Sequence, residues 1–265
     1  MASLFKGDNL KVMQGLKDGC VDFIYLDPPF FSEADYYSGK TQGRKKLFED
    51  RWHGIDDYLE FLRPRLIEMK RLLKDTGLIA VHLDWHAVHY VKVLMDEIFG
   101  YNRFVNEIIW AYKSGGASKK SFARKHDNIL LYSKGKNYYF VPQKEKSYNR
   151  GFKPYHFKGV KEYQDENGWY TLVNQKDIFN IDMVGRTSSE RTGYATQKPE
   201  ALLTMLLKSC CPEGGTAADF FAGSGTLGAA AQSCGCDFIL CDDNEDAIKT
   251  MEKRFELLDI RHIEA

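Results

Sequence analysis

The sequence lacks the features that would direct a protein into a membrane or out of the cell. None of its apolar runs is long enough to span a bilayer, and its first residues carry no signal-peptide pattern. Its six cysteines show no C-x-x-C spacing, which argues against a thiolate zinc site and against a disulfide framework. We therefore expect an intracellular, cytoplasmic protein without disulfides.

The histidines do not form a recognisable metal motif either. His82, Asp84, His86 and His89 lie near one another in the sequence, where a strand is expected to end and a helix to begin. His86 and His89 can share one face of a helix, but no third ligand stands at a zinc-like spacing. We predict that the protein binds no metal ion.

Net charge is also lacking, since 37 basic residues balance 37 acidic ones, but the charge is unevenly distributed. Between Lys113 and Lys198 there are 17 Lys and Arg against 8 Asp and Glu, in a segment rich in aromatic residues. Basic and aromatic side chains together suit a surface that follows a nucleic-acid backbone and stacks on bases. The alternative is a solvated lobe whose aromatics form a small core of their own. The candidate DNA-binding residues are Lys45, Lys46, Lys119, Lys120, Arg124 and Lys125.

Strand patterns alternate with amphipathic helix patterns over most of the chain. The alternation predicts an α/β fold with a Rossmann-like, doubly wound, mostly parallel sheet. Residues 133–194 show weak periodicity and are expected to form an inserted lobe. Strands are expected at 21–26, 78–83, 106–112, 127–132, 215–221 and 238–241. Helices are expected at 56–74 and 86–99. Three more helices are expected, one beginning at Pro199, one ending at Gln232 and one following Asn244.

The strand expected at 21–26 ends in an unusual group of residues, Asp27, Pro28, Pro29 and Phe30. Two consecutive prolines fix φ and cannot donate to a strand ladder, so the chain must leave the sheet at a rigid corner. The corner presents a carboxylate and an aromatic ring, which can accept hydrogen bonds from an exocyclic amine and stack on a flat ring. Because Asp before a proline turn is common for structural reasons, the corner alone does not decide a function.

A glycine-rich loop follows the strand expected at 215–221. Gly223, Gly225 and Gly228 form a G-x-G-x-x-G pattern, in which glycines let the backbone approach a ligand at a helix N-terminus. The next strand ends in Asp242, which fits a ribose hydroxyl pair. Alone, these features support a nucleotide-type cofactor, with NAD and an oxidoreductase as the default. The Asp-Pro-Pro-Phe corner disfavours NAD, because hydride transfer gives the corner no role.

Together, Asp27-Pro-Pro-Phe30 and Asp219-Phe-Phe-Ala-Gly-Ser-Gly-Thr226 resemble the two signature motifs of amino-group DNA methyltransferases. Their order places the catalytic motif first, a variable basic region next and the cofactor glycines last. This order is similar to the beta class, which includes many bacterial adenine-N6 modification enzymes. Gly7-Asp8-Asn9 is similar to the N-terminal cofactor contact of the family, and Thr196-Gln-Lys-Pro199 resembles the segment that precedes the glycine strand.

The resemblance implies S-adenosylmethionine as methyl donor, with S-adenosylhomocysteine as product, and double-stranded DNA as substrate. It implies a catalytic core at 1–112 and 196–265 and an inserted target-recognition region at 113–195. The catalytic residues would be Asp27, Pro28, Pro29 and Phe30. The cofactor-binding residues would be Asp8, Asp27, Lys198, Asp219, Phe220, Ala222, Gly223, Ser224, Gly225, Thr226 and Asp242.

Within the family, Asp27 favours site-specific methylation of adenine N6 on a flipped-out base, because cytosine-N4 members more often carry Ser at this position. Methylation of cytosine C5 would need a cysteine after a proline, and the sequence has no Pro-Cys pair. Cytosine-N4 methylation and a non-catalytic subunit of a modification complex stay open as alternatives. The family allows a homodimer, and a restriction endonuclease partner would be a separate chain.

Overall fold

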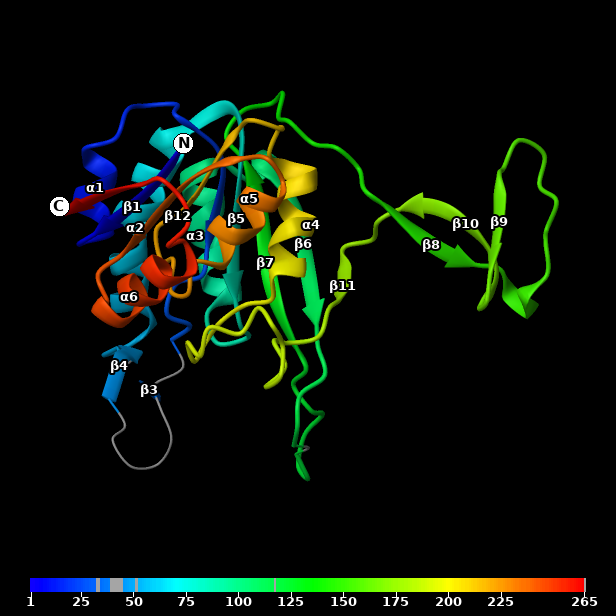
Figure 1. Ribbon diagram of the computed structural model, residues 1–265, viewed down its shortest axis with the longest axis horizontal. Coiled ribbons are helices and arrows are strands. Elements are labelled where there is room, and N and C mark those ends of the chain that lie inside the picture. The colour runs from blue at the N-terminus through cyan, green and yellow to red at the C-terminus, as the bar shows by residue number, and fades with distance from the viewer. Residues whose placement is uncertain (32–33, 39–44, 51, 117, 265) are drawn as a thin grey trace.

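The computed structural model describes residues 1–31, 34–38, 45–50, 52–116 and 118–264 (Figure 1). Over these residues the main sheet has nine strands, and six of its eight strand pairings are parallel. In spatial order the strands are β11 (Ile178–Asn180), β6 (Phe104–Ala111), β7 (His126–Ser133), β5 (Leu73–Leu83), β2 (Val21–Leu26), β12 (Thr216–Asp219), β13 (Asp237–Asp242), β1 (Ala2–Lys6) and β14 (Ile260–Glu264).

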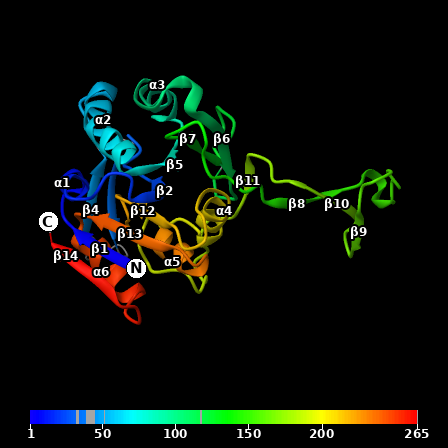
Figure 2. The same ribbon diagram turned by 90° about the horizontal axis from the view of Figure 1, so that it is seen from above.

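Helices cover both faces of this sheet, as Figure 2 shows from above. One face carries α1 (Asn9–Gln14), α2 (Ile55–Leu72) and α3 (Val88–Phe99), and the other carries α4 (Glu200–Cys210), α5 (Thr226–Ser233) and α6 (Glu245–Arg254). Two short 3₁₀ turns are η1 (Tyr101–Arg103) and η2 (Arg150–Phe152). No helix in the ranges given above is long and apolar enough to cross a membrane.

Strand β2 shows why the sheet is covered on both sides. All six of its residues are buried. Phe23 and Tyr25 pack in the core formed with α4, α5 and α6, while Ile24 and Leu26 pack in the core formed with α1, α2 and α3. A strand buried on both faces needs an almost continuous apolar run, and this is what the sequence has at these positions. The predicted Rossmann-like, doubly wound fold is confirmed.

The predicted inserted region, 113–195, does not lie outside the main sheet over its whole length, and its role in target recognition stays a prediction. Strands β7 and β11 both lie within 113–195, yet both belong to the main sheet. β7 runs antiparallel to β5 and β6 and fills the space between them, because its apolar residues 129–132 must be buried on both faces. Two separate segments therefore leave the sheet, the β6–β7 loop and the chain between β7 and β11.

The second of these segments forms a projecting arm, at the right of Figure 1. A three-stranded antiparallel sheet is made of β8 (Lys144–Tyr148), β10 (Gly168–Asn174) and β9 (Glu162–Asp165). Tyr170 packs on Tyr148 and Tyr163, with ring centroids 5.5 and 5.6 Å apart, and these aromatics contact one another while staying partly exposed. A separate hairpin, β3 (Ala34–Ser38) and β4 (Lys45–Asp50), follows the Asp-Pro-Pro-Phe corner.

Candidate active site

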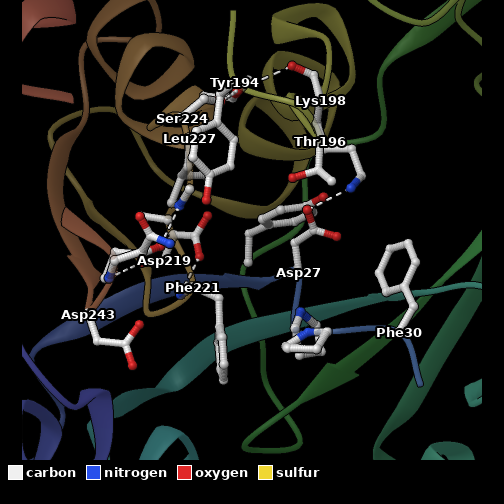
Figure 3. A pocket seen from close by; sticks show the side chains of 18 of the residues that line it. Asp27, Phe30, Tyr194, Thr196, Lys198, Asp219, Phe221, Ser224, Leu227 and Asp243 are labelled. Carbon is white, nitrogen blue, oxygen red and sulfur yellow. Dashed lines mark hydrogen bonds and ion pairs between the residues drawn. The ribbon is translucent and has the colours of Figure 1, made fainter. Parts of the chain in front are cut away.

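Three neighbouring parallel strands deliver acidic residues to one edge of the sheet. β2 pairs with β12 and β12 with β13, so that Asp27 directly after β2, Asp219 at the end of β12 and Asp242 at the end of β13 meet at their carboxyl ends. Ligands of open α/β sheets bind at this edge. The three side chains line one cavity of about 340 Å³ (Figure 3). The two sequence motifs therefore meet in a single site.

The chain turns sharply after the two prolines. Phe31 has a φ of 60°, a left-handed conformation that non-glycine residues seldom adopt and that concentrates at functional sites. The buried Asp50 carboxylate holds this turn, since its Oδ1 accepts hydrogen bonds from the Phe31 N–H and the Trp52 Nε1–H, both at 2.9 Å. The turn places Asp27 and Phe30 on the cavity wall.

The two oxygens of Asp27 have different environments. Oδ2 accepts a hydrogen bond from Lys198 Nζ at 2.6 Å, and both side chains are largely buried. Oδ1 is buried and has no hydrogen-bond partner among the described residues. Leaving a buried acceptor unpaired costs about 1–3 kcal/mol. Oδ1 is thus a fixed acceptor for a donor that enters the cavity.

Phe30 is held by two neighbours. The Lys198 ammonium lies 4.9 Å from the centre of the Phe30 ring, and the His82 ring lies 5.6 Å away, tilted by 33°. Side chains fixed by packing need less ordering when a ligand stacks on them. Phe30 is therefore positioned before any flat ring enters.

Behind Phe30, a buried hydrogen-bond chain links Tyr25, His82, Asp127 and Tyr112. The Tyr25 hydroxyl lies 2.6 Å from His82 Nδ1, His82 Nε2 lies 3.3 Å from Asp127 Oδ2, and the Tyr112 hydroxyl donates to Asp127 Oδ1 at 3.0 Å. Because a carboxylate only accepts, Nε2 carries the proton and Nδ1 accepts from Tyr25. Both ring nitrogens of His82 are therefore engaged in this hydrogen-bond chain. Nowhere in the described ranges do three His, Cys, Asp or Glu side chains form a metal-ligand set.

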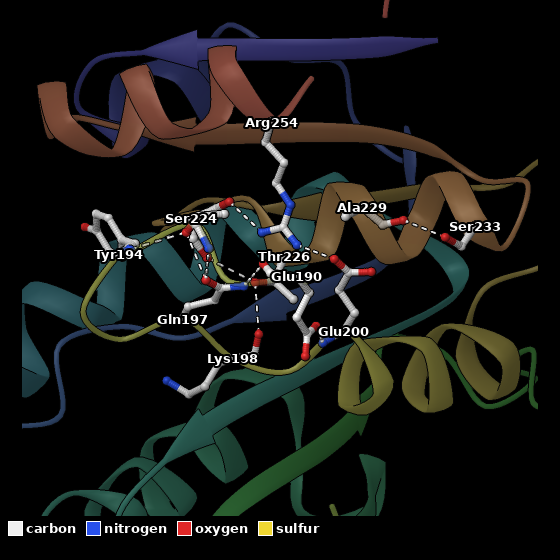
Figure 4. Close-up of polar contacts among 11 residues, drawn as sticks. Glu190, Tyr194, Gln197, Lys198, Glu200, Ser224, Thr226, Ala229, Ser233 and Arg254 are labelled. Carbon is white, nitrogen blue, oxygen red and sulfur yellow. Dashed lines mark hydrogen bonds and ion pairs between the residues drawn. The ribbon is translucent and has the colours of Figure 1, made fainter. Parts of the chain in front are cut away.

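Lys198 connects the two motifs. Its side chain binds Asp27, while its backbone carbonyl accepts a hydrogen bond from Thr226 Oγ1 at 3.2 Å (Figure 4). Arg254 ties the same region together, donating to the Ser224 carbonyl at 2.9 Å and to Glu200 at 2.5 Å. The glycine loop therefore positions the backbone of Lys198, the residue whose side chain binds the Asp27 carboxylate.

The three glycines have different reasons to be glycine. A Cβ on Gly225 would lie 2.8 Å from Met251, and a Cβ on Gly228 would lie 2.8 Å from Phe255, so these two allow α6 to pack closely. Gly223, at a φ of 50°, lines the cavity, and its N–H donates to Asp242 Oδ2 at 2.8 Å. Only the first glycine of the pattern faces the ligand space.

Burial perturbs the two acids that flank this loop. Burial raises the pKa of Asp219 well above its ordinary value. Burial likewise raises the pKa of Asp242 to about 6, although the backbone N–H groups of Asn244 and Gly223 bind its carboxylate and oppose the shift. Carboxyls of this kind gain most from ligands that bring donors or a positive charge.

A family model described as DNA methylase matches residues 21–253, which include both motifs and the cavity. The chain belongs to this DNA methylase family. Among curated relatives, the methylase is 35% identical over 139 residues to the type II methyltransferase M.KpnI of Klebsiella pneumoniae, covering 50% of this chain and 32% of that protein. It is 29% identical to M.EcaI of Enterobacter cloacae, covering 88% of this chain and 64% of that protein. The chain thus spans between about a third and two thirds of these two relatives.

Solved structures share the fold of the methylase. The PvuII DNA methyltransferase, described as cytosine-N4-specific, superposes with a TM-score of 0.67 at 14% identity, covering 97% of this chain and 86% of that chain. A complex of M1.HpyAVI with S-adenosylmethionine superposes with a TM-score of 0.60 at 19% identity, covering 96% and 98%. At such identities the likeness concerns the fold alone.

The structure brings most predicted site residues of the methylase together. Phe220 is an exception, because it is fully buried in the core on the α1–α3 side of the sheet, and its neighbour Phe221 lines the cavity instead. Asp8 caps α1 and pairs with Arg65 at 3.1 Å outside the cavity lining, so its cofactor contact stays a prediction. The predicted residues on the cavity wall are Asp27, Pro28, Pro29, Phe30, Lys198, Asp219, Ala222, Gly223, Ser224, Thr226 and Asp242.

Sequence reasoning missed an aromatic wall of the cavity. The Trp52 and Phe61 rings lie 5.0 Å apart, and Phe61 lies 6.1 Å from Phe221. Thr196 and Phe221 could have been found, since both stand in quoted motifs, whereas no local pattern marks Tyr194 or the two rings near α2. The missed wall residues are Tyr25, Trp52, Phe61, Tyr194, Thr196, Phe221, Leu227, Asp243 and Asn244.

The candidate DNA contacts have different surroundings. Lys45 and Lys46 lie on β4 with side chains outside the described part of the structure, so their role stays a prediction. Lys125 is used internally, because its ammonium binds three backbone carbonyls of its own loop. Arg124 stacks on Trp85 at 3.9 Å from the ring centre. Lys119 and Lys120 are exposed.

Proposed function

We propose that the methylase transfers a methyl group from S-adenosylmethionine to the N6 amino group of adenine in double-stranded DNA. The observation that supports this most is the unpaired, buried Asp27 Oδ1 on the wall of the cavity that the glycine loop also lines. An exocyclic amine is a donor that fits this acceptor. The choice of adenine over cytosine rests on the aspartate itself, because cytosine-N4 members of the family more often carry Ser there.

The residues that would hold the cofactor are those of the glycine loop and its flanking acids. Asp219 would accept from an ammonium group and Asp242 from a ribose, and both gain from such partners because burial raises the pKa of each. The aromatic wall offers faces on which a flat ring stacks. When bound, S-adenosylmethionine supplies an electrophilic methyl group on a positively charged sulfur.

The chain's own contribution is to position the amine. A base inside a duplex is out of reach, so it has to be flipped out at a cost of a few kcal/mol. Phe30 would stack on the extruded base, which is worth roughly 1–3 kcal/mol. Asp27 Oδ1 and the Pro28 carbonyl would accept hydrogen bonds from the two N–H groups of the amine and direct the nitrogen lone pair. Alignment of this kind accounts for most of the catalysis, and no covalent enzyme intermediate is needed.

The test is transfer of label from the methyl donor to DNA, followed by nucleoside analysis. The wild type should yield N6-methyladenine, and Asp27→Ala should abolish transfer while the cofactor Kd stays within about threefold, because Asp27 faces the amine. Glu256→Ala, at an exposed position after α6, is the matched control and should behave as wild type. N4-methylcytosine as product would replace the adenine assignment. Donor binding without transfer to any DNA would favour a non-catalytic subunit.

Further parts of the proposal concern partners. The curated relatives include type II methyltransferases and the Mod subunit of the type III StyLTI restriction-modification enzyme. We infer that the methylase marks DNA in a restriction-modification setting, with the endonuclease on a separate chain and two methylase chains forming a homodimer. Methylome sequencing of a host that expresses it, and its mass in solution, test these parts.

A further inference from the structure

The loop between β6 and β7 projects from the sheet edge that carries the active site. β2 is parallel to β5, and β7 is antiparallel to both β5 and β6, so β6 runs in the direction of β2. The end of β6 at Ala111 therefore lies at the same edge as Asp27. Figure 1 shows the β6–β7 loop extending on the side of the molecule that also carries β3 and β4. A duplex lying over the cavity would meet this loop.

Internal hydrogen bonds give the loop a defined shape. The Lys125 ammonium binds the carbonyls of Ser114, Gly115 and Gly116 at 2.7 to 2.9 Å. Ser118 Oγ accepts from the backbone N–H groups of residues 120 and 121, both at 3.1 Å. The Lys125 ammonium therefore holds the base of the loop, and its contact with a DNA phosphate stays a prediction.

The loop presents one large apolar side chain to solvent. Phe122 is 98% exposed, more than any other aromatic residue in the described part of the chain. Lys119 and Lys120 stand beside it and make no ion pair within the described residues. The returning end of the loop is fixed by Arg124, which stacks on the Trp85 ring. A phenyl ring exposed between cations is suited to a partner that is both anionic and able to stack on the ring.

We propose that Phe122 is a wedge that enters the DNA base stack at the space vacated by the target base. This inference rests on the proposed function and adds the residue that keeps the base extruded. Phenylalanine side chains can enter between base steps, and the lysines would contact the flanking phosphates. Stacking of one base on an aromatic ring corresponds to roughly 5- to 140-fold in affinity. Phe122 acts on the DNA stack and touches neither the cofactor nor the reacting amine.

The experiment compares two duplexes that contain the recognition sequence mapped by methylome sequencing. One duplex has the normal base pair, and the other has the target base opposite a mismatch, which lowers the cost of flipping. Phe122→Ala should lower kcat/KM tenfold or more on the normal duplex and stay within threefold of wild type on the mismatched one. Phe122→Trp should retain activity on both. Leu257→Ala, which truncates another exposed apolar residue (94%), is the matched control and should change neither.

A second variant separates the wedge from charge attraction. Lys119→Gln with Lys120→Gln should weaken binding to both duplexes alike and reduce the salt slope by about 2, because two phosphate contacts are lost. The wedge is overturned if Phe122→Ala equals wild type on the normal duplex, loses activity equally on both duplexes, or dissociates a dimer. If the wild type methylates no DNA, the proposed function is refuted. If the wild type methylates DNA and Phe122→Ala is equally active, only the wedge is refuted.

Discussion

Lys198 is expected to orient the catalytic carboxylate, and Lys198→Met tests this. The substitution keeps a side chain of similar length and leaves both Asp27 oxygens without a donor. Removing one partner of a buried ion pair costs about 3–5 kcal/mol. The pair keeps 11% and 17% exposure, so we expect a loss at the lower end of this range, about 3 kcal/mol.

Urea unfolding measures this loss, and kcat and cofactor Kd are measured on the same preparations. We expect kcat to fall at least a hundredfold with cofactor Kd within threefold of wild type, because the amine acceptor is no longer held in place. Lys208→Met, at an exposed position on α4, should change stability by less than about 0.5 kcal/mol. A loss below 1 kcal/mol, with normal kcat and tenfold weaker cofactor binding, would show that Lys198 is a cofactor ligand.

Three further predictions concern one residue of the cavity wall and two residues that support it from behind. Burial raises the pKa of Asp242 to about 6, so its carboxyl gains a proton as the pH falls through 6. Calorimetry should therefore find cofactor binding about tenfold weaker at pH 5 than at pH 7.5. An affinity that does not change with pH would refute this. Gly228→Ala would place a Cβ 2.8 Å from a ring of α6 and should cost about 1–3 kcal/mol in urea unfolding, whereas Gly185→Ala, in open space, should cost almost nothing. His82→Leu leaves the Tyr25 hydroxyl and Asp127 Oδ2 without a partner, so it should cost about 2–4 kcal/mol and also lower kcat; normal stability would count against the hydrogen-bond chain.

The sequence was most informative where local pattern and chain direction decide the outcome. The strands ending in Asp27, Asp219 and Asp242 could be placed from apolar runs, and parallel pairing then brings their ends to one edge. The last helix was expected after Asn244, and the Asn244 side chain does accept hydrogen bonds from two N–H groups in the first turn of α6. These features depend on residues near each other in the chain.

Contacts between distant segments could not be predicted from the sequence in the same way. Lys198 lies 171 residues from Asp27, and nothing in Thr196-Gln-Lys-Pro199 says whether its side chain faces the cofactor or the catalytic carboxylate. Phe220 was assigned to the cavity because it stands inside the motif, but alternation along β12 turns it to the opposite face from Asp219. Lys125 was counted among the DNA contacts from its charge alone. Charge cannot reveal that the Lys125 ammonium binds backbone carbonyls of its own loop.

The pairing of β2 with β12 has a consequence during synthesis. β12 ends at Asp219, 192 residues after Asp27, so at roughly 5–20 residues per second a ribosome needs about 10–40 s to supply the missing neighbour of β2. Throughout this interval the apolar strand at the centre of the sheet has one side unpaired, and such edges drive aggregation of nascent chains. Solubility on expression should therefore depend on chaperone supply and elongation rate, and a chain that stops before β12 should aggregate even though the catalytic motif is complete.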